Sequence, residues 1–231
     1  MLGTITNTIT IIVGSVAGAI MKRGIKPQYQ ECLFTAMGLA SLALGFNAVA
    51  RTMPKSEYPV LFIVSIALGA LIGTVLNIDQ RFKGLVDRFD KSEDKGSLAK
   101  GLSTGILLYC IGTFSIVGPM LSALEGDNTF LYTNATLDLI TSAVLAATYG
   151  IGMVWAAPVL FCWQGTFYLI AKLFGPIIPD TLVNEIITVG GTLIVASGLS
   201  LLNIKDCKSL NLLPSLLVPI VFFLLKGFVG L

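Results

Sequence analysis

Long apolar stretches separated by short polar breaks dominate the chain. Stretches of about 20 residues, the length that crosses the hydrocarbon core of a bilayer, fall at 3–20, 30–50, 58–77, 102–124, 135–151, 153–173, 183–203 and 211–230. The fifth and sixth are separated only by Gly150-Ile151-Gly152, and together they are too long for one helix. The pattern therefore predicts an all-α, polytopic transmembrane helix bundle with about eight spans, and seven spans is the alternative.

The distribution of lysine and arginine predicts the orientation of these spans. With eight spans, the loops at 21–29, 78–101 and 204–210 share one side and carry eleven of the 15 basic residues. The remaining four are Arg51, Lys55, Lys172 and Lys226. Because basic loops stay in the cytoplasm, we expect these three loops there and both termini outside. The N-terminal segment has neither a basic leader nor an A-x-A site, so we interpret it as a first span.

The loop 78–101 is the only long polar segment. Apolar residues recur in it at helical spacing, with arginines and lysines among them: Ile78, Phe82, Leu85, Val86 and Phe89. This spacing predicts an amphipathic helix on the cytoplasmic leaflet, with its cations facing anionic headgroups. Binding of a partner protein is the alternative.

The composition excludes several classes of protein. Apolar residues make up 55% of the chain and charged residues 12%, about half the share in soluble domains. The absence of histidine excludes His-based triads and His-ligated zinc, and the net charge of +2 is too small to indicate a nucleic-acid partner. The four cysteines form no C-x-x-C pair, and no catalytic or nucleotide motif occurs. We therefore expect neither an enzyme nor a bound metal or cofactor.

The two ends of the chain resemble each other. Gly14, Gly38 and Gly45 near the start match Gly165, Gly191 and Gly198 near the end at offsets of 151 to 153, and Glu31 matches Glu185 at 154. We predict one integral membrane domain, 1–231, made of repeat one at 1–77, the loop 78–101, two intervening spans at 102–151, and repeat two at 153–231. Two spans between three-span repeats make the second copy inverted, a plan common among secondary transporters.

The glycines also have a second interpretation. Small residues let membrane helices approach closely, and Gly14-x-x-x-Gly18, Gly69-x-x-x-Gly73 and Gly101-x-x-x-Gly105 fit that role equally well. Such glycine-rich faces are also compatible with a homodimer.

Several motifs carry a family resemblance over nearly the whole chain. They are Gly3-Thr4-Ile5-Thr6-Asn7, the stretch 111–118 (IGTFSIVG), Leu137-Asp138, Gly150-Ile151-Gly152, Gln164-Gly165 and Asn211-Leu212-Leu213-Pro214. In these motifs the chain resembles the YqgA-like (YdfK-like) family of bacterial inner-membrane proteins, a domain of unknown function. The resemblance implies location in the bacterial inner membrane. Where the family pattern leads us to expect a lysine four residues before Asp138, this chain has Asn134.

Asp138 is the main candidate for intramembrane chemistry, because an ionisable residue in a span is costly and indicates function. We expect it to bind a cation or a proton, with Thr133, Asn134, Thr136 and Thr141 as nearby hydrogen-bonding groups. The alternative is a carboxylate that caps a helix N-terminus near the membrane surface. Glu31 and Glu185 each begin the second span of a repeat, where capping is favoured, and paired gates are the functional alternative.

Neutral polar residues within the spans complete the predicted solute- or ion-binding site. They are Asn7, Ser15, Thr113, Ser115, Gln164, Thr166 and Asn211. Glycines and Pro119 predict a broken fourth helix, and Pro158, Pro214 and Pro219 predict interruptions in the sixth and eighth. Backbone groups freed at such breaks are tolerated only beside protein or a wet cavity. Hydrogen bonding between helices without a ligand is the alternative.

These observations favour a secondary transporter or channel for a small solute or ion, coupled to H⁺ or Na⁺ through Asp138. The alternative is a membrane sensor, scaffold or assembly protein that transports nothing and whose polar residues only pack helices.

Overall fold

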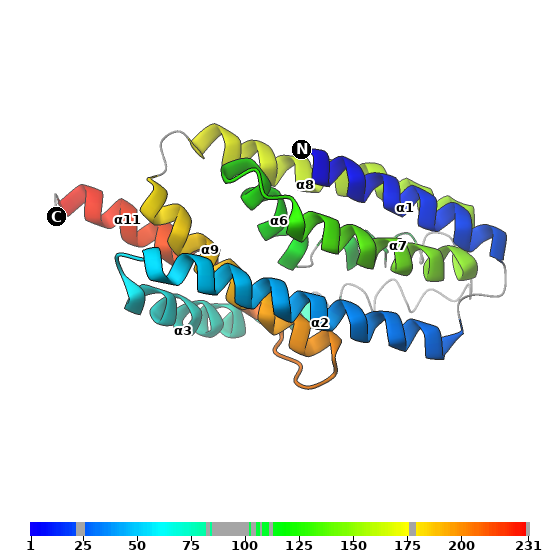
Figure 1. Ribbon diagram of the computed structural model, residues 1–231, viewed down its shortest axis with the longest axis horizontal. Helices are drawn as coiled ribbons and strands as arrows, with labels where there is room; N and C mark the ends of the chain where they lie inside the picture. The colour runs from blue at the N-terminus through cyan, green and yellow to red at the C-terminus, as the bar shows by residue number, and fades with distance from the viewer. Residues whose placement is uncertain are drawn as a thin grey trace. The chain divides into compact units, whose positions relative to one another are not determined.

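A computed structural model describes residues 1–21, 26–81, 84, 102, 105–106, 108–110, 113–175 and 179–229. In this part of the chain every regular element is a helix, which confirms the predicted all-α class. Figure 1 labels the longer helices. In order the elements are α1 (Leu2–Met21), α2 (Pro27–Thr52), η1 (Met53–Lys55), α3 (Pro59–Val75), α6 (Thr113–Leu124), α7 (Thr129–Tyr149), η2 (Ile151–Trp155), α8 (Ala156–Phe174), α9 (Asp180–Leu201), α10 (Ser209–Leu212), η4 (Leu213–Leu216) and α11 (Leu217–Val229).

The described helices match the apolar stretches of the sequence. Six segments are long and apolar enough to cross a membrane: Leu2–Met21, Phe34–Lys55, Thr129–Tyr149, Ile151–Phe174, Asp180–Leu201 and Ser209–Gly227. Pro59–Val75 and Thr113–Leu124 are shorter apolar helices at the predicted third and fourth spans. A polytopic membrane protein accounts for all eight, because apolar faces of this length need lipid around them.

The described residues form two compact units by their contacts. Unit 1 comprises Met1–Met37 and Phe82–Leu173, and unit 2 comprises Gly38–Arg81 and Phe174–Leu231. Unit 1 thus holds the first helix of each predicted repeat together with the intervening spans. Unit 2 holds most of the second helix and the third helix of repeat one, and the corresponding helices of repeat two. The predicted single domain and its internal boundaries stay a prediction.

Helix directions in unit 1 show whether the fifth and sixth apolar stretches form one helix or two. Gly3 faces Leu131 and Gly18 faces Ala143, so α1 and α7 run side by side in the same direction (Figure 1). Met1 approaches Gly165, whereas Ile11 shares a cluster with Leu160, so α8 runs opposite to α1. The reversal between α7 and α8 occurs at Gly150, whose φ of 90° suits glycine, and at η2. These stretches are therefore two antiparallel helices.

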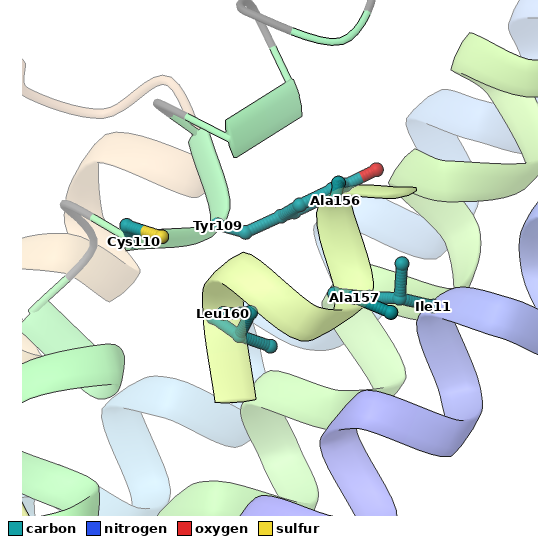
Figure 2. Packing of buried hydrophobic residues seen from close by; sticks show 6 residues of the cluster. All are labelled: Ile11, Tyr109, Cys110, Ala156, Ala157 and Leu160. Carbon is teal, nitrogen blue, oxygen red and sulfur yellow. The ribbon is translucent and has the colours of Figure 1, made fainter. Parts of the chain in front are cut away.

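Glycines and alanines bring the helices of unit 1 close together. A Cβ atom on Gly14 would lie 2.3 Å from the Ser142 hydroxyl oxygen, and one on Gly18 would lie 2.0 Å from the Ala143 carbonyl oxygen. Figure 2 shows a buried cluster in which Ile11 of α1 meets the start of α8. Its members are Ile11, Tyr109, Cys110, Ala156, Ala157 and Leu160. This packing holds α1, α7 and α8 together around the polar residues described below.

Unit 2 uses glycines in the same way. A Cβ atom on Gly69 of α3 would lie 2.0 Å from the Ser215 hydroxyl oxygen, and one on Gly73 would lie 2.0 Å from the Asn211 carbonyl oxygen. Both partners belong to the last span, which is broken into α10, η4 and α11, with Pro214 in η4. The close approach explains why α3 carries glycine at these two positions.

The contacts between α2 and α9 are reciprocal. Gly38 faces the Gly198 carbonyl and Leu202, while Gly45 faces the Gly191 carbonyl and Val195. In return, Gly191 faces Val49 and Gly198 faces Leu42. Adding 153 to a residue number in α2 converts each contact into another one of the set, with Leu42 mapping to Val195 and Val49 to Leu202. The two helices are antiparallel, and the seven-residue glycine spacing in each forms a mutual packing seam.

Three predictions about breaks and loops have mixed outcomes. The predicted interruption of the eighth span is confirmed by η4. Pro158, in contrast, lies in the first turn of α8, where proline removes no intrahelical bond, and the interruption before this helix is η2. Only 78–81 and Gly84 of the predicted amphipathic segment are described, all in helical conformation. The rest of that segment and Gly101 lie outside the described residues.

Candidate functional site

Asp138 lies near the middle of α7. Helix α7 begins at Thr129, with Asn128 as its N-cap residue, so Asp138 is nine residues, or about 13 Å, along the helix. Its side chain is 5% exposed. This position excludes the alternative in which Asp138 caps a helix N-terminus.

Two neutral amides hold the Asp138 carboxylate. Asn7 of α1 donates to Oδ2 at 2.9 Å, and Asn134, one turn earlier on α7, donates to the same oxygen at 3.0 Å. Each hydrogen bond to a charged group contributes about 1.5–3 kcal/mol. Asn134 stands where we expected the family's lysine, so an amide here supplies the hydrogen bond that an ammonium group could supply. Unlike a lysine, however, Asn134 brings no positive charge to the Asp138 carboxyl group.

The other polar residues expected around Asp138 behave differently. The hydroxyls of Thr133, Thr136 and Thr141 donate to carbonyls four residues earlier on α7: those of Thr129, Tyr132 and Leu137. Each of these hydroxyls has its bond within its own helix, and Asn134 is the member of the predicted group that bonds the carboxylate.

Ser115 of α6 extends the network to two more helices. Its hydroxyl oxygen accepts from Asn134 at 3.0 Å and from Gln164 of α8 at 3.3 Å. The hydroxyl donates in turn to the Tyr109 carbonyl, six residues earlier. A serine within an α-helix bonds carbonyls three or four residues back, so this contact six residues back differs from the usual one. Helix α6 itself continues through Pro119, so the described residues show no break at this proline.

Two buried polar atoms beside this network lack a partner. They are the amide oxygen of Gln164 and the hydroxyl of Tyr109, neither of which has a hydrogen bond among the described residues. A buried polar group left unpaired costs about 1–3 kcal/mol. The two atoms are free to accept from, or donate to, a bound molecule.

The hydrogen bonds above join four of the eight predicted site residues: Asn7, Ser115, Asp138 and Gln164. Ser15 is buried in α1 two turns beyond Asn7, its hydroxyl without a partner among the described residues. Thr113 is buried at the start of α6. Thr166 is exposed and bonds the Cys162 carbonyl of its own helix. Asn211 belongs to unit 2, where its side chain accepts from the Asp79 backbone N–H at 2.8 Å.

The two glutamates of the predicted repeat differ in their surroundings. Glu31 is exposed on α2, whereas Glu185, in the second turn of α9, is 1% exposed. Glu185 Oε1 accepts from the Ser56 hydroxyl at 2.5 Å and from the Tyr58 N–H at 3.4 Å. These two donors lie in the segment after α2, and neither of them is a first-turn N–H of α9.

Sequence reasoning missed several partners in these sites. Tyr109, Ser56 and Tyr58 carried no sequence signal, because their roles depend on which loop or broken helix end reaches a carboxylate in space. Asn134 was identifiable, since a residue four positions before Asp138 on a helix lies on the same face.

Comparison with known proteins places the chain in a family without assigning an activity. The chain is 54% identical over 229 residues to the uncharacterized membrane protein YdfK of Bacillus subtilis, covering 99% of this chain and 98% of that one. It is 26% identical over 225 residues to the uncharacterized protein YqgA of Escherichia coli, covering 94% of each. No solved structure gives a significant match.

The family model described as a protein of unknown function (DUF554) matches residues 2–224. The match spans both units and every helix of the predicted site, so the resemblance seen in the sequence motifs is confirmed. The chain belongs to the DUF554 family.

Proposed function

We propose that this protein is a secondary transporter or channel for a small solute or ion in the bacterial inner membrane. The observation that carries the proposal is the buried network Asn7–Asp138–Asn134–Ser115–Gln164, which joins α1, α6, α7 and α8. Its charge lies half-way along a helix long enough to span a bilayer. Intramembrane carboxylates of this kind mark ion and substrate pathways.

The chemistry of the network favours a small cation or a polar solute that carries hydrogen-bond donors. Both hydrogen bonds to Asp138 come from neutral amides, so in these two contacts no basic side chain competes with a ligand for the carboxyl group. The unpaired Gln164 oxygen adds a second acceptor, and the Tyr109 hydroxyl adds a donor. Coupling to H⁺ or Na⁺ through Asp138 is part of the proposal, which includes no catalytic step.

The proposal includes two inverted three-helix repeats. The reciprocal seam between α2 and α9, in which an offset of 153 exchanges the contact pairs, is what two copies related by a twofold axis would produce. The matched pair Gly14 and Gly165 gives no such support, because Gly14 packs tightly on α7 whereas a Cβ on Gly165 would meet only the Met1 side chain, at 3.9 Å.

The proposed orientation places the basic loops in the cytoplasm and both termini outside. Helix directions agree with the alternation of spans that puts these loops on one side: α1 runs parallel to α7, α2 antiparallel to α9, and α3 antiparallel to the last span. The glycine-rich faces that were compatible with a homodimer pack within the chain, so they no longer argue for one.

Reconstitution of Asp138→Asn tests the transport function. Purified protein in liposomes would be assayed for uptake of sodium-22 and carbon-14 amino acids, and for proton flux with an internal pH dye. We expect the wild type to carry at least one probe and Asp138→Asn to fall to the background of empty liposomes, because it removes the only charge of the network. Size-exclusion elution must be unchanged. Thr166→Val, on an exposed face of α8, is the matched control and keeps full flux.

A sensor or scaffold that packs helices through the same residues is the competing function. It predicts background flux of every probe in the wild type, and an Asp138→Asn variant that loses stability instead of flux. Equal flux in the wild type and in Asp138→Asn would also contradict the proposal.

A further inference from the structure

We propose that Glu185 is the centre of a second ion site, in unit 2, which takes a monovalent hard cation of the size of Na⁺. The inference goes beyond the proposed transport function, because it adds a cation site separate from Asp138. Its role in transport rests on that function, but the binding itself is measurable without any flux.

The first observation is a buried carboxylate with an open oxygen. Glu185 is almost completely buried, and its two hydrogen bonds, from Ser56 and Tyr58, both go to Oε1. Oε2 is also buried and has no hydrogen-bond partner among the described residues. A carboxylate removed from water is strongly destabilised unless its charge and its lone pairs find partners. A cation bound at Oε2 would satisfy both needs.

The second observation is a group of hydroxyl oxygens one helical turn away. Thr188 lies on the same face of α9 as Glu185, and its hydroxyl is 2.7 Å from that of Thr52, at the end of α2. Thr52 also contacts the Ala48 carbonyl at 2.8 Å, and Thr188 contacts the Asn184 carbonyl at 2.8 Å. The two hydroxyl groups have one proton each for these three contacts. Lone pairs on the two hydroxyl oxygens therefore stay available to a cation. Carboxylate, hydroxyl and carbonyl oxygens are the ligands that hard cations prefer.

The third observation is the local charge. Helix α2 ends at Thr52, with the exposed Arg51 in its last turn, and a helix C-terminus carries partial negative charge that favours a cation. Helix C-terminal ends and unwound carbonyls coordinate Na⁺ in several transporter folds. Among the described residues no group of three or more acidic, cysteine or histidine side chains could hold a metal ion. A single carboxylate therefore matches a single positive charge better than a divalent one.

The nearby lysine has another partner. Lys226 donates to the Tyr58 hydroxyl at 2.6 Å, and its ammonium nitrogen lies 5.1 Å from the centroid of the same ring. Tyr58 thus contacts Glu185 through its backbone and Lys226 through its side chain. This arrangement fixes the segment after α2 against α11 and holds Ser56 in place beside the carboxylate.

Thermal unfolding of the full-length protein in detergent tests the site. Melting would be followed while NaCl replaces choline chloride at constant ionic strength and pH. We expect a saturable rise in Tm of roughly 2–4 °C for the wild type, because an ion that binds only the folded state stabilises it. Glu185→Gln removes the rise. Glu31→Gln, the exposed glutamate at the matching position of the predicted repeat, keeps it.

Further variants separate this site from the proposed function. If Glu185→Gln does not fold, Thr188→Val provides the test, and we expect it to raise the half-saturating Na⁺ concentration. Asp138→Asn should abolish flux yet keep the Na⁺-dependent rise. The proposal is overturned if Na⁺ and choline give identical wild-type melting curves, or if Glu185→Gln keeps the rise that Asp138→Asn loses. A wild type that responds to pH and not to Na⁺ would indicate a proton and would also overturn it.

Discussion

At the scale of single residues, Asp138 shows how a carboxyl group can be held inside an apolar helix bundle by amide side chains. Asn7 and Asn134 replace the hydrogen bonds of water, and Ser115 holds Asn134 in the orientation that this requires. Asn7, Asp138 and Gln164 could be predicted to meet, because buried polar groups in lipid seek one another. Ser115 was also among the predicted site residues, but its bond to the Tyr109 carbonyl, six residues away, could not be predicted.

Removal of one amide donor tests this account. Asn7→Leu and Asn134→Leu should each lower the free energy of unfolding by about 1–3 kcal/mol, because each leaves a buried carboxylate with one hydrogen bond fewer. Denaturant unfolding in detergent measures the change. In an Asp138→Leu background the same substitutions should cost clearly less, since the acceptor is gone. An undiminished cost in that background would show that the asparagines act through packing alone.

At the scale of helices, the glycines of this chain allow close packing between helices. This was the second interpretation of the glycine spacing in the sequence. Gly14 and Gly18 let α1 approach α7, and Gly69 and Gly73 let α3 approach the broken last helix. Their spacing was legible in the sequence, but the partner of each glycine face was not. Glycines four residues apart determine which face of a helix is flat. They do not determine which other helix packs against that face.

The matched glycines of the predicted repeat give a direct comparison. Gly14→Ala should destabilise the protein by about 1–3 kcal/mol, since the new methyl group would overlap Ser142 and the Leu139 carbonyl. Gly165→Ala should be neutral or slightly stabilising, because its nearest neighbour is the flexible Met1 side chain and alanine favours the helix. Thermal melting of both variants in one detergent decides the matter. A similar loss in the two would contradict the packing described here.

At the scale of the whole molecule, the count and direction of the helices form a consistent set. The eight apolar stretches reappear as six long helices and two shorter ones. The parallel pair α1 and α7 requires an odd number of crossings between them, which the stretches 30–50, 58–77 and 102–124 supply. The opposite directions of α7 and α8 show that the fifth and sixth stretches are two separate helices.

Fusion reporters test the proposed orientation. Alkaline phosphatase, which folds only outside the cytoplasm, should be active when fused after Leu231 and inactive when fused after Lys100. Green fluorescent protein at the same two positions should give the opposite pattern. The physical reason is the retention of the eleven basic residues in three loops on the cytoplasmic side. Active phosphatase after Lys100 would reverse the orientation.

The sequence by itself determined that this protein is surrounded by lipid and that its regular elements are helices. Apolar stretches long enough for a bilayer leave helices as the form that satisfies their backbone within each segment, and the few polar residues inside them were visible as candidates. Only the tertiary structure decided which candidates meet. It turned Asn7 towards Asp138, left Thr166 on an exposed face, and buried Glu185 while Glu31 stayed exposed. Helical periodicity gives each side chain a face, whereas the neighbour on that face comes from packing between segments more than a hundred residues apart.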